Sequence, residues 1–321
     1  MPKVHTRSCN TGKAAIHTAP AGLHDRFGGS KAGGKSAVTA ASWRVKPLPD
    51  ARPSVGSLSL DRRNSGRRLH IGFAADLPMF GGRRGLARET KVEGFLDMAP
   101  EVAFSYDGHG SADPAAATAA VRVTGRYKAG WHVKGPVAGP RLRFRVPIAM
   151  LAAYPVVIAG TVPVVIALKL RLVLEVRVDG RMTMDVQEAG GGTVRAGTRY
   201  TRAAGWQPDN GVDAGPLPGG TAKVSGEGAL RLMLGPELSV ALYDAVGVDA
   251  FAGPYLRITA AGLRPATKDG GQPTGDPRLY GGVTLETSVF AGSPAKVLGI
   301  RLRKRVVFPV ITREWPISPA R

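Results

Sequence analysis

Residues 168–186 read LKLRLVLEVRVDGRMTMDV, and apolar and polar side chains alternate along the whole stretch. Leucine, valine or methionine occupies every second position, apart from Gly180. A period of two is the pattern of a β-strand with one buried and one exposed face. A two-residue turn at Asp179-Gly180 would move the methionines to the opposite face. Either the strand runs straight through Gly180, or a three-residue loop pairs Val178 with Met182; both keep one apolar face.

The same period recurs along the chain from residue 66 onward. It is clear at 101–107, 121–133, 141–146, 230–242, 283–289 and 300–306. No stretch shows the period of a helix of ordinary length. The 43 glycines and 25 prolines fit strands punctuated by turns. We therefore expect an all-β fold with long antiparallel strands in one or two curved, sandwich-like sheets. The domain is 66–321, and a two-sheet version would divide into 66–190 and 191–321.

Residues 1–65 differ from the rest of the chain, because they lack any periodic apolar run and are rich in Gly, Ser, Ala and basic residues. The full chain carries a net charge of +20, from 44 basic and 24 acidic residues. Such a segment buries too little apolar surface to offset the entropy of ordering. We interpret 1–65 as a disordered basic arm. It has no apolar core of a secretory signal peptide, and it resembles either a transit peptide or a stretch translated upstream of the true start.

The stretch from Val146 to Leu168 contains no charged residue and is long enough to span a bilayer as a helix. However, Pro147, Pro155 and Pro163 would each remove a helical hydrogen bond. The repeated Pro-Val-Val-Ile favours two short buried β segments, each opened by a proline.

Residues 29–36, GSKAGGKS, match the phosphate-binding pattern G-x-x-x-x-G-K-S. Phosphate binding requires a buried strand before this loop and a helix after it. No apolar strand precedes residue 29, and Pro47 would end any helix soon after Ser36. We interpret the match as chance, so no cofactor is expected.

A second group of reactive side chains lies at 107–113. Asp107, His109, Ser111 and Asp113 could serve a hydrolase or a metal site. The segment is more typical of a polar turn between two strands, so no catalytic residue and no metal ligand is assigned. His132, on the polar face of its strand, is either a pH-responsive contact for a polyanion or an exposed surface histidine.

Basic side chains recur on the polar face of three successive predicted strands. They are Arg122, Arg126 and Lys128, then Arg141, Arg143 and Arg145, then Lys169, Arg171 and Arg177. If these strands are neighbours, the nine cations lie on one sheet face. The planar fork of arginine suits phosphate, sulfate and carboxylate groups. The alternative is a charged face that only keeps the sheet soluble.

The segments 235–243 (GPELSVALY) and 252–256 (AGPYL) resemble a loosely defined group of β-rich bacterial surface or secreted proteins. The later LYGGV at 279–283 fits the same group. The resemblance covers about residues 90–321. It implies an envelope or extracellular role, with no activity and no functional residue to carry over.

These observations favour a non-enzymatic structural or binding protein that engages an anionic polymer or surface: polysaccharide, nucleic acid or anionic lipid. A second copy of the chain is a further partner to consider. One alternative is a hydrolase that uses the turn at 107–113. Another is a membrane-associated β protein that uses the apolar segment 146–168.

Overall fold

A computed structural model describes residues 4–6, 23–24, 27–37, 44–47, 58–65, 68–77, 90–152, 156–158, 164–242, 246–260, 277–297 and 300–317. The strands are β1 (Val4–Thr6), β2 (Lys31–Ala37), β3 (Arg44–Pro47), β4 (Leu58–Ser65), β5 (Arg68–Leu77), β6 (Thr90–Asp107), β7 (Thr118–Ala152), β8 (Val156–Ile158), β9 (Val164–Thr201), β10 (Gly205–Pro208), β11 (Gly211–Pro216), β12 (Thr221–Leu242), β13 (Val246–Ala260), β14 (Arg278–Val297), β15 (Ile300–Val307) and β16 (Ile311–Ile317). A 3₁₀ turn, η3, spans Pro114–Ala116.

All the described strands belong to one sheet. Its main path runs in the order β1-β16-β14-β13-β12-β9-β7-β6-β5-β4, and the other six strands pair with members of this path. Neighbouring strands along the path are antiparallel. The predicted all-β fold is confirmed, in its one-sheet version. No sheet boundary falls at residue 190, because β9 passes through it without interruption.

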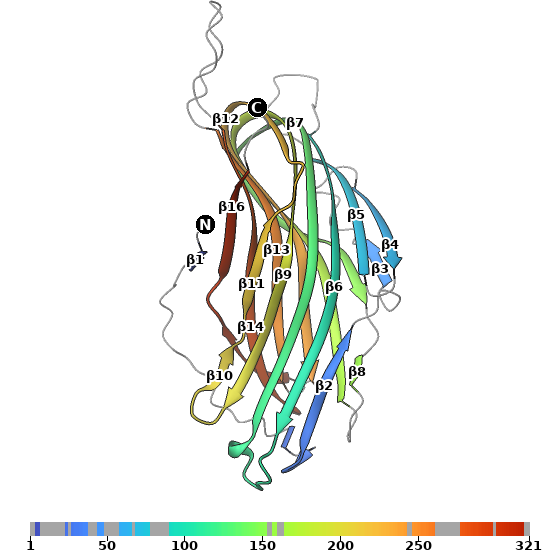
Figure 1. Cartoon of the computed structure of the whole chain (residues 1–321), viewed down its shortest axis with the longest axis vertical. Helices are drawn as coiled ribbons and strands as arrows, with labels where there is room; N and C mark the ends of the chain where they lie inside the picture. The colour runs from blue at the N-terminus through green and yellow to red at the C-terminus, as the bar shows by residue number, and fades with distance from the viewer. Residues whose placement is uncertain are drawn as a thin grey trace, which may run out of the picture.

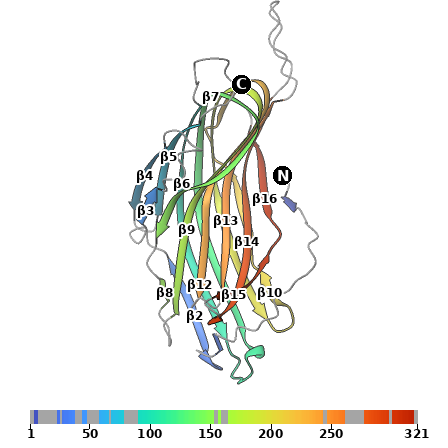
Figure 2. The same ribbon diagram turned by 180° about the vertical axis from the view of Figure 1, so that it is seen from behind.

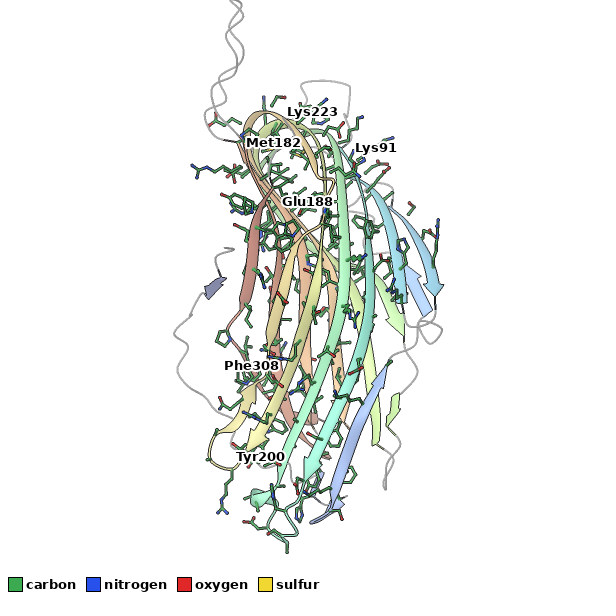
Figure 3. All side chains as sticks on the ribbon, in the orientation of Figure 1. Lys91, Met182, Glu188, Tyr200, Lys223 and Phe308 are labelled. Atoms are coloured by element: carbon green, nitrogen blue, oxygen red, sulfur yellow. The ribbon has the colours of Figure 1, made fainter. Side chains whose placement is uncertain are left out.

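The sheet is folded over on itself into two layers. β7 and β9 contain 35 and 38 residues, and they run up one side of the molecule, over its upper end and down the other (Figures 1 and 2). The front layer contains β5, β6, β10, β11, the first part of β7 and the last part of β9. The back layer contains β13, β14, β15, most of β12, and the remaining parts of β7 and β9. Figure 3 places Met182 and Lys223 near the upper end, and Tyr200 and Phe308 toward the lower one.

Three glycines on neighbouring strands mark the bend. Gly180 of β9 is the backbone partner of Gly139 on β7 and of Gly228 on β12. Gly180 has a φ of +95°, which residues with a side chain rarely adopt. A Cβ there would lie 2.6 Å from the carbonyl oxygen of Glu227. β9 therefore bends at Gly180 but continues through it without a turn, which is the first of the two predicted arrangements.

The core lies between the layers. Alternate residues of each long strand point inward, such as Val121 and Val133 from the front layer and Leu232 and Leu256 from the back layer, and all four are fully buried. Two layers of a sheet pack about 10 Å apart when their inner faces are apolar. The apolar residues of the predicted alternation therefore point inward and fill the space between the layers.

A smaller apolar cluster lies on the outer face of the back layer, where the period of two predicts polar side chains. Val173, Met233, Phe251 and Tyr255 come from β9, β12 and β13 and are all buried. A Cβ at Gly253 would lie 2.6 Å from the Met233 sulfur and from the Phe251 ring, so this glycine leaves room for the cluster. The outer face of the back layer is thus partly apolar.

The predicted arm at 1–65 is described in short segments only. Four of these segments are the strands β1 to β4, which the sequence pattern does not predict. β2 pairs with β6 and β4 pairs with β5. Strands at a sheet edge are held by backbone hydrogen bonds, so they form without an apolar face. Residues 23–24 and 27–30 of the arm are also described, and Leu23 and Phe27 are buried in the core. Cys9 lies outside the described residues.

The apolar segment at 146–168 forms β structure wherever it is described. β8 begins directly after Pro155 and β9 directly after Pro163, and the two strands pair as a hairpin. The prediction of two β segments, each opened by a proline, is confirmed for the backbone. No helix in the described part of the chain has the length and apolar character needed to cross a membrane.

Candidate binding face

The nine predicted cations fall on both layers. Arg122, Arg126 and Lys128 lie on β7 in the front layer; Arg141, Arg143 and Arg145 lie on β7 beyond the bend; and Lys169, Arg171 and Arg177 lie on β9 in the back layer. Their predicted placement on three separate strands of one face needs correction. The bend carries β7 from one outer face of the molecule to the other. For Arg141, Arg143, Arg145 and Lys169 the structure describes the backbone alone.

The front cations are balanced by nearby acids. Arg122 donates from Nε to Asp209 at 2.7 Å, and Arg195 Nε lies 3.2 Å from the same carboxylate. Arg126 and Lys128 are exposed, and they line a shallow groove of about 710 Å³.

Asp97 and Glu101 line the same groove, together with Arg68. Three cations and two carboxylates therefore face one another across it. This groove offers little net positive charge to a polyanion.

The back cations with described side chains also contact carboxylates. Arg171 pairs with Glu237 of β12 at 2.9 Å. Arg177 donates from Nε to Glu175 at 2.5 Å. The side chain of Glu175 is only 2% exposed, so this ion pair sits at the edge of the apolar cluster and not in open solvent.

The register places Arg177 in a line of arginines that crosses the back layer. Arg143 of β7 is the partner of Arg177, Arg177 is the partner of Arg231 on β12, and Arg231 is the partner of Arg257 on β13. We call these four residues the arginine row. Like charges directly opposite each other on a sheet are destabilising. The row must therefore be held by other contacts.

Aromatic rings support two members of the row. The Arg231 guanidinium lies 4.2 Å from the centre of the Tyr255 ring, and that of Arg257 lies 4.2 Å from the centre of the Tyr280 ring. Such stacking attracts a cation to the face of the ring. Arg231 also donates to the Thr284 hydroxyl at 3.1 Å. Burial lowers the pKa of Arg231, and its Nε has no hydrogen-bond partner within the described residues.

Glu314 of β16 anchors the far end of the row. Arg257 donates to both of its carboxylate oxygens, at 3.0 and 2.6 Å, and the Tyr255 hydroxyl donates to it at 2.9 Å. Burial opposes ionisation of Glu314, but these hydrogen bonds outweigh it and lower the pKa of the carboxyl. The three arginines of the row whose side chains are described are thus accompanied by two carboxylates, Glu175 and Glu314.

Arg231 and Arg257 were not among the predicted binding residues. Each stands between two core residues, Leu230 and Leu232 or Leu256 and Ile258, so the period of two does predict that it points outward. The sequence alone does not align the two with Arg177, because that alignment depends on the register of three strands.

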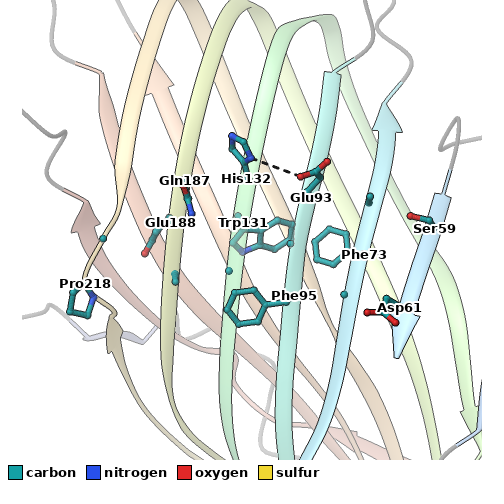
Figure 4. A pocket seen from close by; sticks show the side chains of 16 residues that line it. Ser59, Asp61, Phe73, Glu93, Phe95, Trp131, His132, Gln187, Glu188 and Pro218 are labelled. Atoms are coloured by element: carbon teal, nitrogen blue, oxygen red, sulfur yellow. Dashed lines mark ion pairs between the residues drawn. The ribbon is translucent and has the colours of Figure 1, made fainter. Parts of the chain in front are cut away.

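A second groove, of about 560 Å³, crosses the upper part of the front layer (Figure 4). The rings of Phe73, Phe95 and Trp131 line it. At its rim, His132 Nε2 lies 3.0 Å from Asp185 and His132 Nδ1 lies 4.0 Å from Glu93.

His132 is therefore a half-buried surface histidine held between two carboxylates. The hydrogen bond from His132 lowers the pKa of Asp185, and the nearby Lys134 lowers it further. Glu93 and Asp185 already occupy the positions beside His132 that the anionic groups of a polyanion would need.

The segment 107–113 is a polar turn between β6 and η3, as predicted. Asp107 accepts a hydrogen bond from the backbone N–H of His109 at 2.8 Å, and Asp113 accepts one from Ala115 at 2.8 Å. His109 has a φ of +53°, which fits a tight turn. The side chains serve the turn itself, and within the described residues no group of three metal-binding side chains converges.

The GSKAGGKS match at 29–36 forms the start of β2 and the turn before it. The backbone N–H of Gly28 donates to His24, and that of Ser30 donates to Phe27. Lys31 pairs with Asp107 at 3.0 Å. The described residues here form a strand beside β6 and not a loop followed by a helix. This geometry agrees with a chance match.

Fold and face together define an all-β protein with one sheet folded into two layers and a row of arginines across one outer face. The chain matched no family model, no curated protein and no solved structure.

Proposed function

We propose that this protein is a non-enzymatic binding protein that holds an extended anionic polymer against the outer face of its back layer. The observation that carries this proposal is the arginine row: Arg143, Arg177, Arg231 and Arg257 are successive partners on four neighbouring strands. Strands in a sheet lie about 4.8 Å apart, so the row offers a cation at each such step, perpendicular to the strands. A polymer that crosses the strands meets Arg177, Arg231 and Arg257 in turn.

The charge of the row supports an anionic ligand. Among the described side chains of the row, three arginines stand against two carboxylates, Glu175 and Glu314, so positive charge is left in excess. Guanidinium groups bind sulfate, phosphate and carboxylate through paired hydrogen bonds. An anion laid along the row would also relieve the repulsion between neighbouring arginines.

The aromatic residues favour a polysaccharide over single-stranded nucleic acid. Bases of a single strand need free aromatic faces on which to stack. The rings of Tyr255 and Tyr280 are already covered by Arg231 and Arg257, each at 4.2 Å. A sulfated or carboxylated polysaccharide needs only the guanidinium groups.

Retention on an immobilised sulfated polysaccharide through a salt gradient tests the proposal. We expect Arg177→Gln to elute at clearly lower salt than the wild type, because a half-exposed member of the row is lost. The matched control is Arg195→Gln on the front layer, which removes the same charge from an arginine that also pairs with a carboxylate. It should elute with the wild type.

Equal shifts for the two variants would show that only the total charge matters and would overturn the proposal. A column that carries single-stranded nucleic acid provides the second arm. Stronger retention there than on the polysaccharide would overturn the choice of polymer.

A further inference from the structure

The groove on the upper part of the front layer has a floor of small residues with one aromatic ring among them. Gly72 of β5, Phe95 of β6, Gly130 of β7 and Ala189 of β9 are successive backbone partners on neighbouring strands. All four line this groove, whose volume is about 560 Å³. The neighbouring Leu96 is buried inward, so the alternation places Phe95 and its partners on the outer face. We call these four residues the groove floor.

The Phe95 ring lies over the backbone of Gly130. A Cβ at Gly130 would lie 2.4 Å from Cε1 of the ring and 3.0 Å from both Cδ1 and Cζ. The ring is nearly parallel to that of His70, at 18° and 6.0 Å between centres. Phe95 is half-buried, and Figure 4 shows its ring nearly face-on. One face of the ring therefore rests on the sheet, and the other faces the groove.

The other two aromatic residues of the groove belong to the core. Phe73 and Trp131 are each 5% exposed, and their rings pack edge to face at 5.5 Å. A Cβ at Gly94 would lie 2.7 Å from Cζ of Phe73, which places this ring on the inner side of the sheet. Phe95 thus provides the aromatic surface that a ligand in the groove can reach.

Polar side chains flank the floor along the strands. Glu93, His132 and Gln187 are the next outward residues of β6, β7 and β9 on one side, and they are backbone partners of one another. On the other side, Asp97 of β6 and Lys128 of β7 are also partners, and they line the adjoining groove. These side chains supply both donors and acceptors of hydrogen bonds on both sides of the ring.

The charges around the groove are mixed. Asp61 lies 3.0 Å from Arg63, and Asp97 lies 2.5 Å from His70. Among the described residues that line the groove there is no lysine or arginine, so a polyanion would meet Asp61 and Glu93 without a compensating cation. A hydrocarbon would cover these carboxylates without replacing their hydrogen bonds to water. The groove therefore favours a neutral ligand that is rich in hydroxyl groups.

An extended peptide does not fit this place. Peptides that add to a sheet do so at a free edge, where backbone groups are unpaired. The strands of the floor are paired on both sides, β5 with β4 and β6, β6 with β5 and β7, and β7 with β6 and β9. A ligand of the groove must therefore bind through side chains on the face of the sheet.

We propose that this groove binds a straight chain of neutral sugar units laid across the strands, with one sugar ring stacked on Phe95. The face of an aromatic ring carries partial negative charge, which attracts the weakly positive C–H groups of a sugar. Glu93 and Gln187 accept and donate hydrogen bonds to its hydroxyl groups. Five strands from Asp61 to Ala189 span about 19 Å, which leaves room for several sugar units. This site lies on the opposite outer face from the arginine row and does not depend on it.

Isothermal titration of the full chain with cellotetraose, a straight glucose chain, tests this proposal. We expect cellotetraose to bind, and both glucose and the curved isomer maltotetraose to bind at least tenfold more weakly. The affinity should not change between about 0.05 and about 0.5 M salt, because the ligand carries no charge. Phe95→Ala should weaken binding by about tenfold, because it removes the stacking surface.

Two further variants separate the groove from general surface effects. Val307→Ala removes an apolar side chain that is 67% exposed on β15, outside the groove, and it should bind cellotetraose as the wild type does. Gly72→Thr keeps Phe95 but fills the floor beside it, and should weaken binding at least tenfold. A Cβ at Gly72 would come no closer than 3.6 Å to its neighbours, so the fold accommodates this change.

The outcomes also distinguish this site from the arginine row. Phe95→Ala should elute from the sulfated polysaccharide at the same salt concentration as the wild type. The proposal is overturned if the wild type does not bind cellotetraose, if maltotetraose binds equally well, or if salt weakens the binding. Equal affinities of Phe95→Ala and Val307→Ala would overturn it as well.

Discussion

Replacement of Glu188 by glutamine should remove a loss of stability that the wild-type protein undergoes between about pH 4 and about pH 7. Glu188 is buried between the layers, and this burial raises its pKa to about 7. The folded protein therefore keeps a proton that the unfolded chain releases from about pH 4.3 upward. The free energy of unfolding falls through this window and is level above it. The expected fall is about 3 kcal/mol.

Urea unfolding at a series of pH values measures this effect. Glu188→Gln keeps an acceptor for Trp315 but cannot ionise. The difference in the free energy of unfolding between Glu188→Gln and the wild type should grow by about 3 kcal/mol, in favour of the variant, from pH 4 to pH 8. Glu237→Gln, on the half-exposed outer face of β12, makes the same substitution away from the core and serves as the control. A constant difference between Glu188→Gln and the wild type at every pH would mean that Glu188 does not retain its proton in the folded state.

Gly180→Ala should destabilise the protein by about 3 kcal/mol or more, because it places a side chain at the bend of the sheet. The φ of +95° is unfavourable for alanine. The new Cβ would lie 2.6 Å from both the Glu227 carbonyl oxygen and the Gly228 Cα, and neither backbone atom moves easily. Thermal unfolding should show a fall in Tm of several degrees.

Gly215→Ala provides the matched control for the bend. A Cβ at Gly215 would meet no atom within 4 Å. This variant should unfold within about 0.5 kcal/mol of the wild type. Equal Tm values for Gly180→Ala and the wild type would argue that β9 does not bend at this glycine.

The strands of this protein could be predicted from the sequence because nearly every residue on their inner faces is apolar. Leu172, Leu174, Val176 and Val178 are all buried, as the period of two requires. β8 and β9 begin directly after Pro155 and Pro163, as predicted, but Pro100 lies inside β6 and Pro147 inside β7, so a proline alone does not mark the start of a strand.

The bend could not be predicted in the same way. The alternation passes unchanged through Gly180, so it cannot distinguish a straight strand from one that crosses between layers. For this reason Arg122 and Arg143 were expected on separate strands of one face, although they lie on one strand in different layers.

The buried polar groups were equally hidden in the sequence. Glu188 keeps the parity of Val186, which alone predicts an inward side chain, but a lone acid in a glycine-rich segment is more typical of a loop. Its partner Trp315 is 127 residues away. Glu188 and Trp315 meet because β16 lies close to the front layer.

The measurement that tests the arginine row most directly is the salt dependence of binding to a soluble sulfated polysaccharide. Each arginine that contacts the polymer adds about one to the slope of log K against log salt concentration. We predict that Arg177→Gln lowers this slope by about one, and that Arg195→Gln leaves it unchanged. Equal slopes for Arg177→Gln and the wild type, with a lower slope for Arg195→Gln, would contradict the account and place the polymer on the front layer.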